Sequence, residues 1–221
     1  MKKRFIYIPA GLVSALILFL FIVHKLLFAD SVYPKAESGI LLIPEGADFQ
    51  QVCDTIESRF TVKNPGILNW FAAKKNYANR IRPGKYIVSK PVSVNKLINI
   101  LRSGDQTPVR VTFNNIRTLE QLAGRFGKQL ATDSTEFLQF FSDESHYSAD
   151  GFKRETIISL FIPDTYEFFW NTSPEGIYKR MLKEYERFWN GDRTKKAEEK
   201  GLTKLEVSIL ASIIDDEVNR K

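Results

Sequence analysis

The stretch Leu202–Lys221, LTKLEVSILASIIDDEVNRK, decides how the C-terminal part of this 221-residue chain is organised. Thr203 with Glu206 three residues later fits a capping box, so we expect a helix to begin there. Apolar residues recur at three- and four-residue spacing, namely Leu202, Leu205, Ile209, Leu210, Ile213 and Ile214. The sequence therefore predicts an amphipathic helix with one strongly apolar face.

Three acids, Asp215, Asp216 and Glu217, follow on this helix. At about 100° per residue, Glu217 projects between Ile213 and Ile214 and continues the apolar face. Asp215 points to roughly the opposite side, and Asp216 lies on the flank. We therefore expect Glu217 to be desolvated, which raises a carboxyl pKa as a general acid requires near neutral pH. A solvated acid at the end of a helix is the alternative that spacing alone leaves open.

Composition limits the classes of function. Residues 2–4 supply three of the six net positive charges, and the remainder is too diffuse to predict nucleic-acid binding. The single cysteine, Cys53, excludes an intramolecular disulfide, and the two histidines, His24 and His146, form no metal-ligand pattern with it. No glycine-rich phosphate loop or nucleophile elbow is present in the sequence. We expect neither a metal nor another cofactor.

The segment Phe5–Val23 carries no charged residue and is long enough to cross about 30 Å as a helix. Residues 24–30, which follow it, offer no signal-peptidase site, and the basic residues 2–4 favour a cytoplasmic N-terminus. We therefore expect residues 1–29 to be a cytoplasmic tip and transmembrane signal anchor, followed by a linker over residues 30–38. A buried core helix is the alternative.

Residues 39–106 read as a small α+β module. Predicted strands span residues 39–43 and 85–88, and predicted helices span residues 48–60, 64–75 and 93–101. Asn64 and Pro65 suit the start of the second helix, and Gly104 suits the end of the third. This order resembles a LysM-like module, a fold often used to hold glycan chains. A spacer that binds nothing is the alternative.

Residues 107–221 form the second predicted domain. The alternation in Val109–Phe113 predicts a strand, and helices are predicted at residues 119–130, 134–141 and 173–190. Residues 142–152 read as a polar surface loop, and residues 191–201 as a charged connection.

Within this domain, ISLFIPDTYEFFW at residues 158–170 surrounds a few polar groups with aromatic rings. Such a composition is typical of a carbohydrate cleft, because sugar faces stack on rings while hydroxyls need fixed hydrogen bonds. An ordinary hydrophobic core explains the same composition.

Three features in this order carry a resemblance to a known family. They are the apolar N-terminal segment with its module, IPDTYEF at Ile162–Phe168, and LASII-x-x-E at Leu210–Glu217. Together they resemble the MltG (YceG-like) endolytic murein transglycosylases over essentially the whole chain. The implied fold is α+β: a transmembrane helix, a LysM-like module, and the helical N-terminal part of an α+β catalytic domain.

Glu217 occupies the position of the family's catalytic acid, the second glutamate of ASIIEKET. Elsewhere the chain departs from the pattern, with Ile162 for Phe, Asp215 for Glu and Val218 for Thr. Family members also continue beyond this helix with NRL, DPT and YNTY-like segments. We therefore expect the chain to be truncated within its catalytic domain.

The resemblance implies cleavage of the bond between N-acetylmuramic acid and N-acetylglucosamine inside nascent glycan strands, which terminates their elongation. Glu217 is the implied acid and base, and Asp164, Thr165 and Tyr166 are the implied lining of the glycan groove. The product carries a 1,6-anhydro-muramyl end. The implied location is the bacterial inner membrane with the C-terminal part in the periplasm, and peptidoglycan synthases are candidate protein partners.

Two other classes of function fit the same sequence. One is a catalytically inactive, membrane-anchored peptidoglycan-binding or scaffold protein, which would bind murein without forming product. The other is an anchored module whose helices bind only a protein partner, which would neither bind nor cleave murein.

Overall fold

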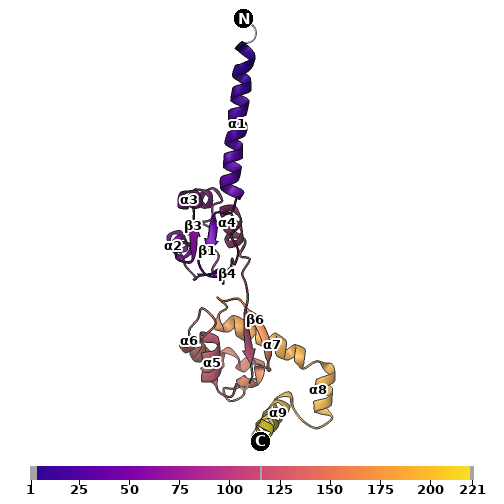
Figure 1. Cartoon of the computed structure of the whole chain (residues 1–221). Helices are drawn as coiled ribbons and strands as arrows, with labels where there is room; N and C mark the ends of the chain where they lie inside the picture. Colours follow the sequence, from indigo (N-terminus) through magenta and orange to yellow (C-terminus); the bar gives the residue numbers. More distant parts are fainter. Residues whose placement is uncertain (1–3, 115, 220–221) are drawn as a thin grey trace. The chain divides into compact units, whose positions relative to one another are not determined.

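The structure, a computed structural model, describes residues 4–114 and 116–219 (Figure 1). The chain divides into two compact units, Met1–Thr107 and Pro108–Lys221. Each unit has its own hydrophobic core and combines helices with short antiparallel strands. The α+β class is therefore confirmed for both units.

The predicted transmembrane anchor is wrong. Helix α1 spans Arg4–Phe28 and contains the segment in question, Phe5–Val23. Among the helices of the described residues, none combines the length and the apolar character that a membrane span requires.

Two pairs of antiparallel strands form the centre of the N-terminal unit. Strand β1 (Val32–Pro34) pairs with β3 (Phe60–Val62), and β2 (Ile40–Ile43) pairs with β4 (Gly84–Ile87). The side chain of Val32 is fully buried, and its backbone also bridges to Val92. Strand β1 thus lies inside the segment predicted to be a linker and belongs to the folded unit.

The three helices expected in this unit are present. They are α2 (Phe49–Arg59), α3 (Pro65–Lys74) and α4 (Val94–Ser103). Asp48 and Gln51 form a reciprocal capping box at the start of α2, and the Ser93 hydroxyl accepts a hydrogen bond from Lys96 N at the start of α4. Gly104 ends α4 in the left-handed conformation, at φ 71°.

The C-terminal unit is built on one antiparallel pair, β5 (Val109–Phe113) and β6 (Asp164–Phe168). Val111 lies opposite Tyr166, and Thr112 lies opposite Thr165. Because side chains alternate along a strand, Val111, Phe113 and Tyr166 share the buried face. This pairing places the IPDTYEF segment beside a strand that is far from it in the sequence.

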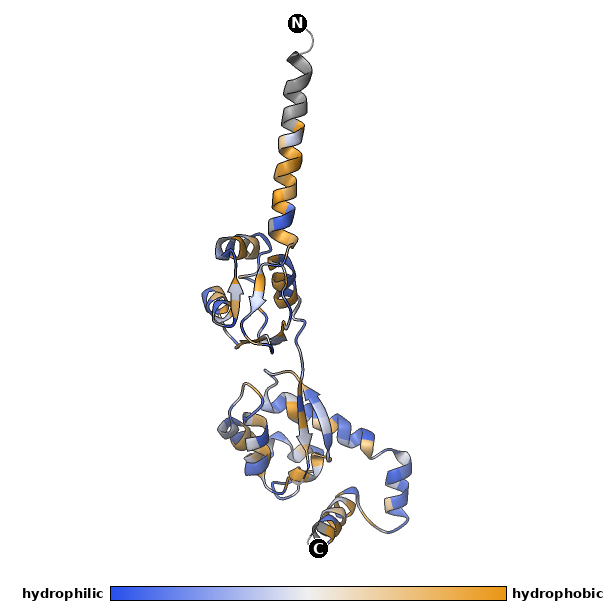
Figure 2. Ribbon diagram, in the orientation of Figure 1, coloured by the Kyte–Doolittle hydropathy of each residue, from blue (hydrophilic) through white to orange (hydrophobic). Residues whose placement is uncertain are grey.

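Helices and short 3-10 turns make up the rest of the described part of this unit. They are α5 (Leu119–Gly127), α6 (Ser134–Ser142), η1 (Glu144–His146), η2 (Ser148–Asp150), η3 (Ile157–Leu160), α7 (Pro174–Phe188), α8 (Gly191–Glu198) and α9 (Lys204–Asn219). Helix α5 ends at Gly127, three residues before the predicted end. Helix α8 occupies the segment predicted to be a connection, and its residues are largely hydrophilic (Figure 2).

Candidate functional site

Strand β6 begins with the residues predicted to line the glycan groove, Asp164, Thr165 and Tyr166. Asp164 is exposed, and its carboxylate accepts a hydrogen bond from the backbone N–H of Thr165 at 2.6 Å. The hydroxyl of Thr165 lies 2.9 Å from that of Thr112 on β5, within hydrogen-bond distance. The two threonines therefore link the strands through their side chains as well as their backbones.

Tyr166 points into the hydrophobic core. Its side chain is 9% exposed, and its hydroxyl donates to the carbonyl oxygen of Ile162 at 3.0 Å. Burial, with a smaller effect from the Asp164 carboxylate, raises the pKa of Tyr166 to about 12. The phenol is therefore neutral and already hydrogen-bonded, which leaves Asp164 and Thr165 as the members of the trio that can reach a ligand.

The aromatic residues around this segment serve mainly as core. Phe161 and Phe168 are buried in the same cluster as Tyr166, whereas Phe169 is 52% exposed. Of the two explanations that the composition left open, ordinary packing thus accounts for most of these rings. Apart from the exposed Phe169, these rings need no role in stacking on sugars to account for their presence.

Helix α9 carries the predicted catalytic acid and begins with the predicted capping box. The Glu206 carboxylate accepts hydrogen bonds from the Thr203 backbone N–H and hydroxyl, each at 2.8 Å, and the Thr203 hydroxyl accepts from Glu206 N at 3.2 Å. These hydrogen bonds lower the pKa of Glu206, and the bond from the Thr203 backbone has the largest effect. Val207 packs against the core of the unit, and the helix contacts η3 and α8. The first turns of α9 are therefore fixed.

The second half of α9 differs from the prediction. Leu210, Ile213 and Ile214 are 45%, 53% and 63% exposed, and the Glu217 side chain is exposed as well. The expectation that Glu217 is desolvated is thus wrong for this chain, because the apolar face that it continues is not covered. Asp215 is also exposed, while the side chain of Asp216 lies outside the described residues.

The structure relates the two motifs through η3. This turn packs against α9 and, after Phe161, leads into the segment that carries Asp164. Asp164, Thr165 and Tyr166 are consecutive on β6, whereas Glu217 lies far along α9. The predicted groove residues and the predicted acid are therefore connected through the packing of η3 against α9. Neither of the two hollows at α6, α7 and α9 contains them.

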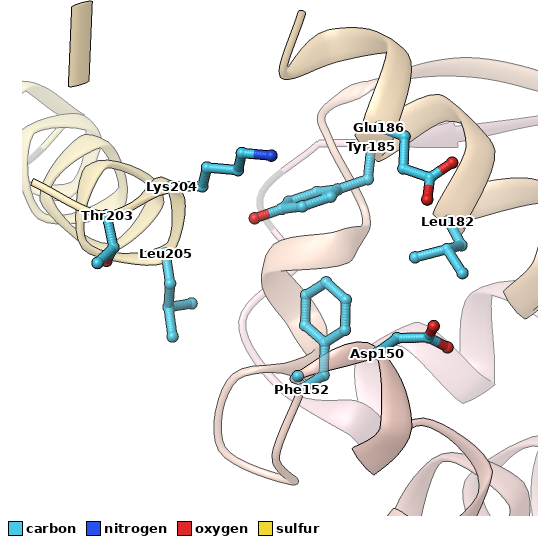
Figure 3. A pocket seen from close by; sticks show the side chains of 9 residues that line it. Asp150, Phe152, Leu182, Tyr185, Glu186, Thr203, Lys204 and Leu205 are labelled. Carbon is cyan, nitrogen blue, oxygen red and sulfur yellow. The ribbon is translucent and has the colours of Figure 1, made fainter. Parts of the chain in front are cut away.

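A cavity of about 410 Å³ lies where α9 begins (Figure 3). Its walls come from three places in the chain: the end of η2 with Gly151 and Phe152, the second half of α7, and residues 203–205. A second hollow, of about 480 Å³, lies between α6 and the start of α7. Neither hollow is predicted from the sequence, although Phe152 follows a polar loop and Tyr185 lies on a largely polar helix.

These features define a class of protein. Its N-terminal unit is a small α+β module, and its C-terminal unit combines one antiparallel strand pair, an IPDTYEF segment and an acid-bearing amphipathic helix that packs next to that segment. A sequence profile of the YceG-like family matches residues 41–221. The chain belongs to the YceG-like family.

Individual proteins also match the chain. Proteins named endolytic murein transglycosylase from two strains of Streptococcus pneumoniae are 26% identical to the chain over 207 residues, which cover 79% of the chain and 36% of each relative. The chain thus spans little more than a third of the length of these relatives. A crystal structure of a YceG-like protein from Listeria monocytogenes matches 75% of this chain and 60% of its own, with 19% identity and a TM-score of 0.37.

Proposed function

We propose that this protein is an endolytic murein transglycosylase that uses Glu217 as its single acid and base. The observation that carries the proposal is the packing of α9 against η3, because it holds the Glu217 helix beside the segment that leads to Asp164. Membership of the YceG-like family and the names of the streptococcal relatives support the same activity.

The proposed reaction needs one carboxyl group. Protonated Glu217 gives its proton to the glycosidic oxygen between N-acetylmuramic acid and N-acetylglucosamine, and the bond from that oxygen to the anomeric carbon breaks. The muramyl 6-hydroxyl oxygen then bonds to the anomeric carbon, and its proton passes to the Glu217 carboxylate. The products are an N-acetylglucosamine end with a free 4-hydroxyl and a 1,6-anhydro-muramyl end, with no water consumed. This differs from hydrolases that pair two carboxylates.

The exposed face of α9 suits a polymer substrate. A glycan strand lying over Leu210, Ile213 and Ile214 would exclude water from Glu217 only when substrate is present. In a dry environment the protonated carboxyl that a general acid requires is favoured. We propose that Asp164 and Thr165 bind sugar hydroxyls of the same glycan strand, and that the protein works outside the cytoplasm, where murein lies.

The test is product analysis with purified murein. The full chain should release glycans with 1,6-anhydro-muramyl ends, detected by mass spectrometry. Glu217→Gln removes the transferable proton and should reduce the yield at least about a hundredfold. The neighbouring exposed acid provides a matched control, and Asp215→Asn should keep activity within about threefold.

The outcomes separate the candidate functions. Equal product from Glu217→Gln and the unsubstituted chain, with unchanged circular dichroism, would overturn the role of Glu217. Murein binding without any anhydro product from the unsubstituted chain would replace the enzyme with the wall-binding alternative.

A further inference from the structure

The cavity at the start of α9 has the construction of a ligand site. Phe152 and Tyr185 form its floor, with ring centroids 5.3 Å apart in an edge-to-face arrangement and with exposures of 7% and 8%. Leu182 and Leu205 complete the apolar part. A volume of about 410 Å³ lies within the range of small-ligand pockets. The floor is rigid because its two rings are packed into the core of the unit.

Charges of both signs stand around this floor. Lys204 extends from α9 toward Tyr185, while Glu186 and Asp150 lie on the other side of the ring (Figure 3). The side chains of Glu186 and Lys204 form no hydrogen bond or ion pair with another residue that the structure describes, although the Lys204 carbonyl accepts a hydrogen bond from the Ser208 hydroxyl. Oδ2 of Asp150 accepts a hydrogen bond from the Tyr178 hydroxyl, so Oδ1 remains available to a ligand. The rim thus presents a cation and two carboxylates to a ligand.

This pattern selects a particular ligand chemistry. A carboxylate on the ligand would pair with the Lys204 ammonium, and an ammonium group would pair with Glu186 and Asp150. An aliphatic chain between the two charges would lie on Phe152 and Tyr185. A neutral sugar would form no ion pair with the charges of the rim, and a polyanion would be repelled by the two carboxylates. The rim therefore favours a short zwitterionic peptide.

The second hollow, between α6 and the start of α7, is less suited to a ligand. Two of the three carboxylates that line it are already engaged, because Asp143 accepts a hydrogen bond from Ser145 N at 2.9 Å and Glu175 pairs with Lys179. It is also lined by His146, which stacks on Phe140 at 4.2 Å between ring centroids. These groups satisfy one another within the unit.

We propose that the cavity formed by Phe152, Tyr185, Glu186 and Lys204 binds the stem peptide of murein. The inference rests on the proposed function, since murein is the polymer that carries short peptides with free amino and carboxyl groups along its glycan. A stem peptide held here would fix the position of the strand relative to α9, because Lys204 is the first residue of the helix that carries Glu217.

The test measures binding of a synthetic stem tripeptide, which has a free diamino-acid amine and a C-terminal carboxylate, to the full chain by calorimetry. Glu186→Gln and Lys204→Gln should each weaken binding about tenfold, since each removes one charge-assisted contact. Glu198→Gln and Lys200→Gln change exposed charges outside the cavity and should leave the affinity unchanged.

Ligand variants make the assignment specific. When the diamino-acid amine of the tripeptide is acetylated, Glu186→Gln should no longer change the affinity. When the C-terminal carboxylate is amidated, Lys204→Gln should no longer change it. Absence of tripeptide binding, or equal affinity for all four protein variants, would overturn the proposal.

The two proposals fail separately. Glu217→Gln should bind the tripeptide as the unsubstituted chain does, because Glu217 does not line the cavity. Murein cleavage without tripeptide binding would overturn the peptide site alone. Tripeptide binding that is sensitive to Glu186→Gln, in a chain that does not cleave murein, would overturn the transglycosylase activity alone.

Discussion

Phe126 is the centre of the core that holds strand β6 in place, and its replacement gives a quantitative test of that core. The side chain is fully buried. Its ring centroid lies between 5.0 and 6.4 Å from those of Phe113, Phe137, Phe141, Phe161 and Phe168. Phe→Ala in a core costs about 3–5 kcal/mol, and aromatic pairs add about 0.5–1.5 kcal/mol beyond buried area. We therefore expect Phe126→Ala to lower the free energy of unfolding by about 4 kcal/mol.

Urea unfolding followed by tryptophan fluorescence measures this loss. Trp170 and Trp189 report on the C-terminal unit, and a Trp70→Phe background removes the signal of the N-terminal unit. Phe169→Ala is the matched control, because that ring is 52% exposed, and it should change the free energy by less than about 0.5 kcal/mol. A loss below about 1 kcal/mol for Phe126→Ala would refute the central role of this ring.

Other predictions concern the backbone and the titrating groups. Gly39→Ala should destabilise the N-terminal unit by more than about 2 kcal/mol in urea, because φ is +50° and a Cβ would collide with the Val88 carbonyl, whereas Gly66→Ala, in open space, should be neutral or stabilising. Burial raises the pKa of Cys53 to about 11, so a thiol reagent at pH 8 should modify it at least about tenfold more slowly in the folded than in the unfolded chain, and equal rates would contradict its burial. Since the pKa of Tyr166 rises from 10.0 to about 12 on folding, the unfolded chain loses this proton first, and stability should fall between pH 10 and 12. Tyr166→Phe should flatten that decline, and an unchanged slope would count against the assignment.

Local signals in the sequence were enough to place most helices. Thr203 with Glu206 predicts the start of α9, and Thr172 or Ser173 before Pro174 predicts the start of α7, where Ser173 is the cap residue. Both signals act within four residues of the chain, so they do not depend on the rest of the fold. The strand at Val109–Phe113 was equally clear, because its alternation reflects one buried face.

Elements without such a signal were missed. Strands β1 and β3 have three residues each. They pair with each other, although a helix lies between them in the sequence. Helix α8 is almost entirely polar and buries only Ala197, so it has no apolar periodicity to detect. Its start is fixed by the Asn190 side chain, which accepts from Arg193 N at 3.1 Å.

The candidate site shows a different limit. The spacing of Leu210, Ile213 and Ile214 correctly identifies the face of α9 to which Glu217 belongs. Whether that face is buried depends on what packs against it, and a helical pattern contains no information on its partner. The inference from apolar spacing to a desolvated carboxyl failed at that step.

The IPDTYEF segment requires a further distinction when its role is tested. Tyr166 belongs to the buried face of β6, with its hydroxyl bound to Ile162, so its substitution disturbs the core before it affects any ligand. Asp164 is exposed, and among the residues that the structure describes its carboxylate accepts a hydrogen bond from the backbone N–H of Thr165 alone. Asp164→Asn keeps the shape and an acceptor oxygen while removing the charge, so it should alter murein turnover without changing the urea midpoint. A fall in turnover that accompanies a lower midpoint would instead assign Asp164, like Tyr166, to the fold.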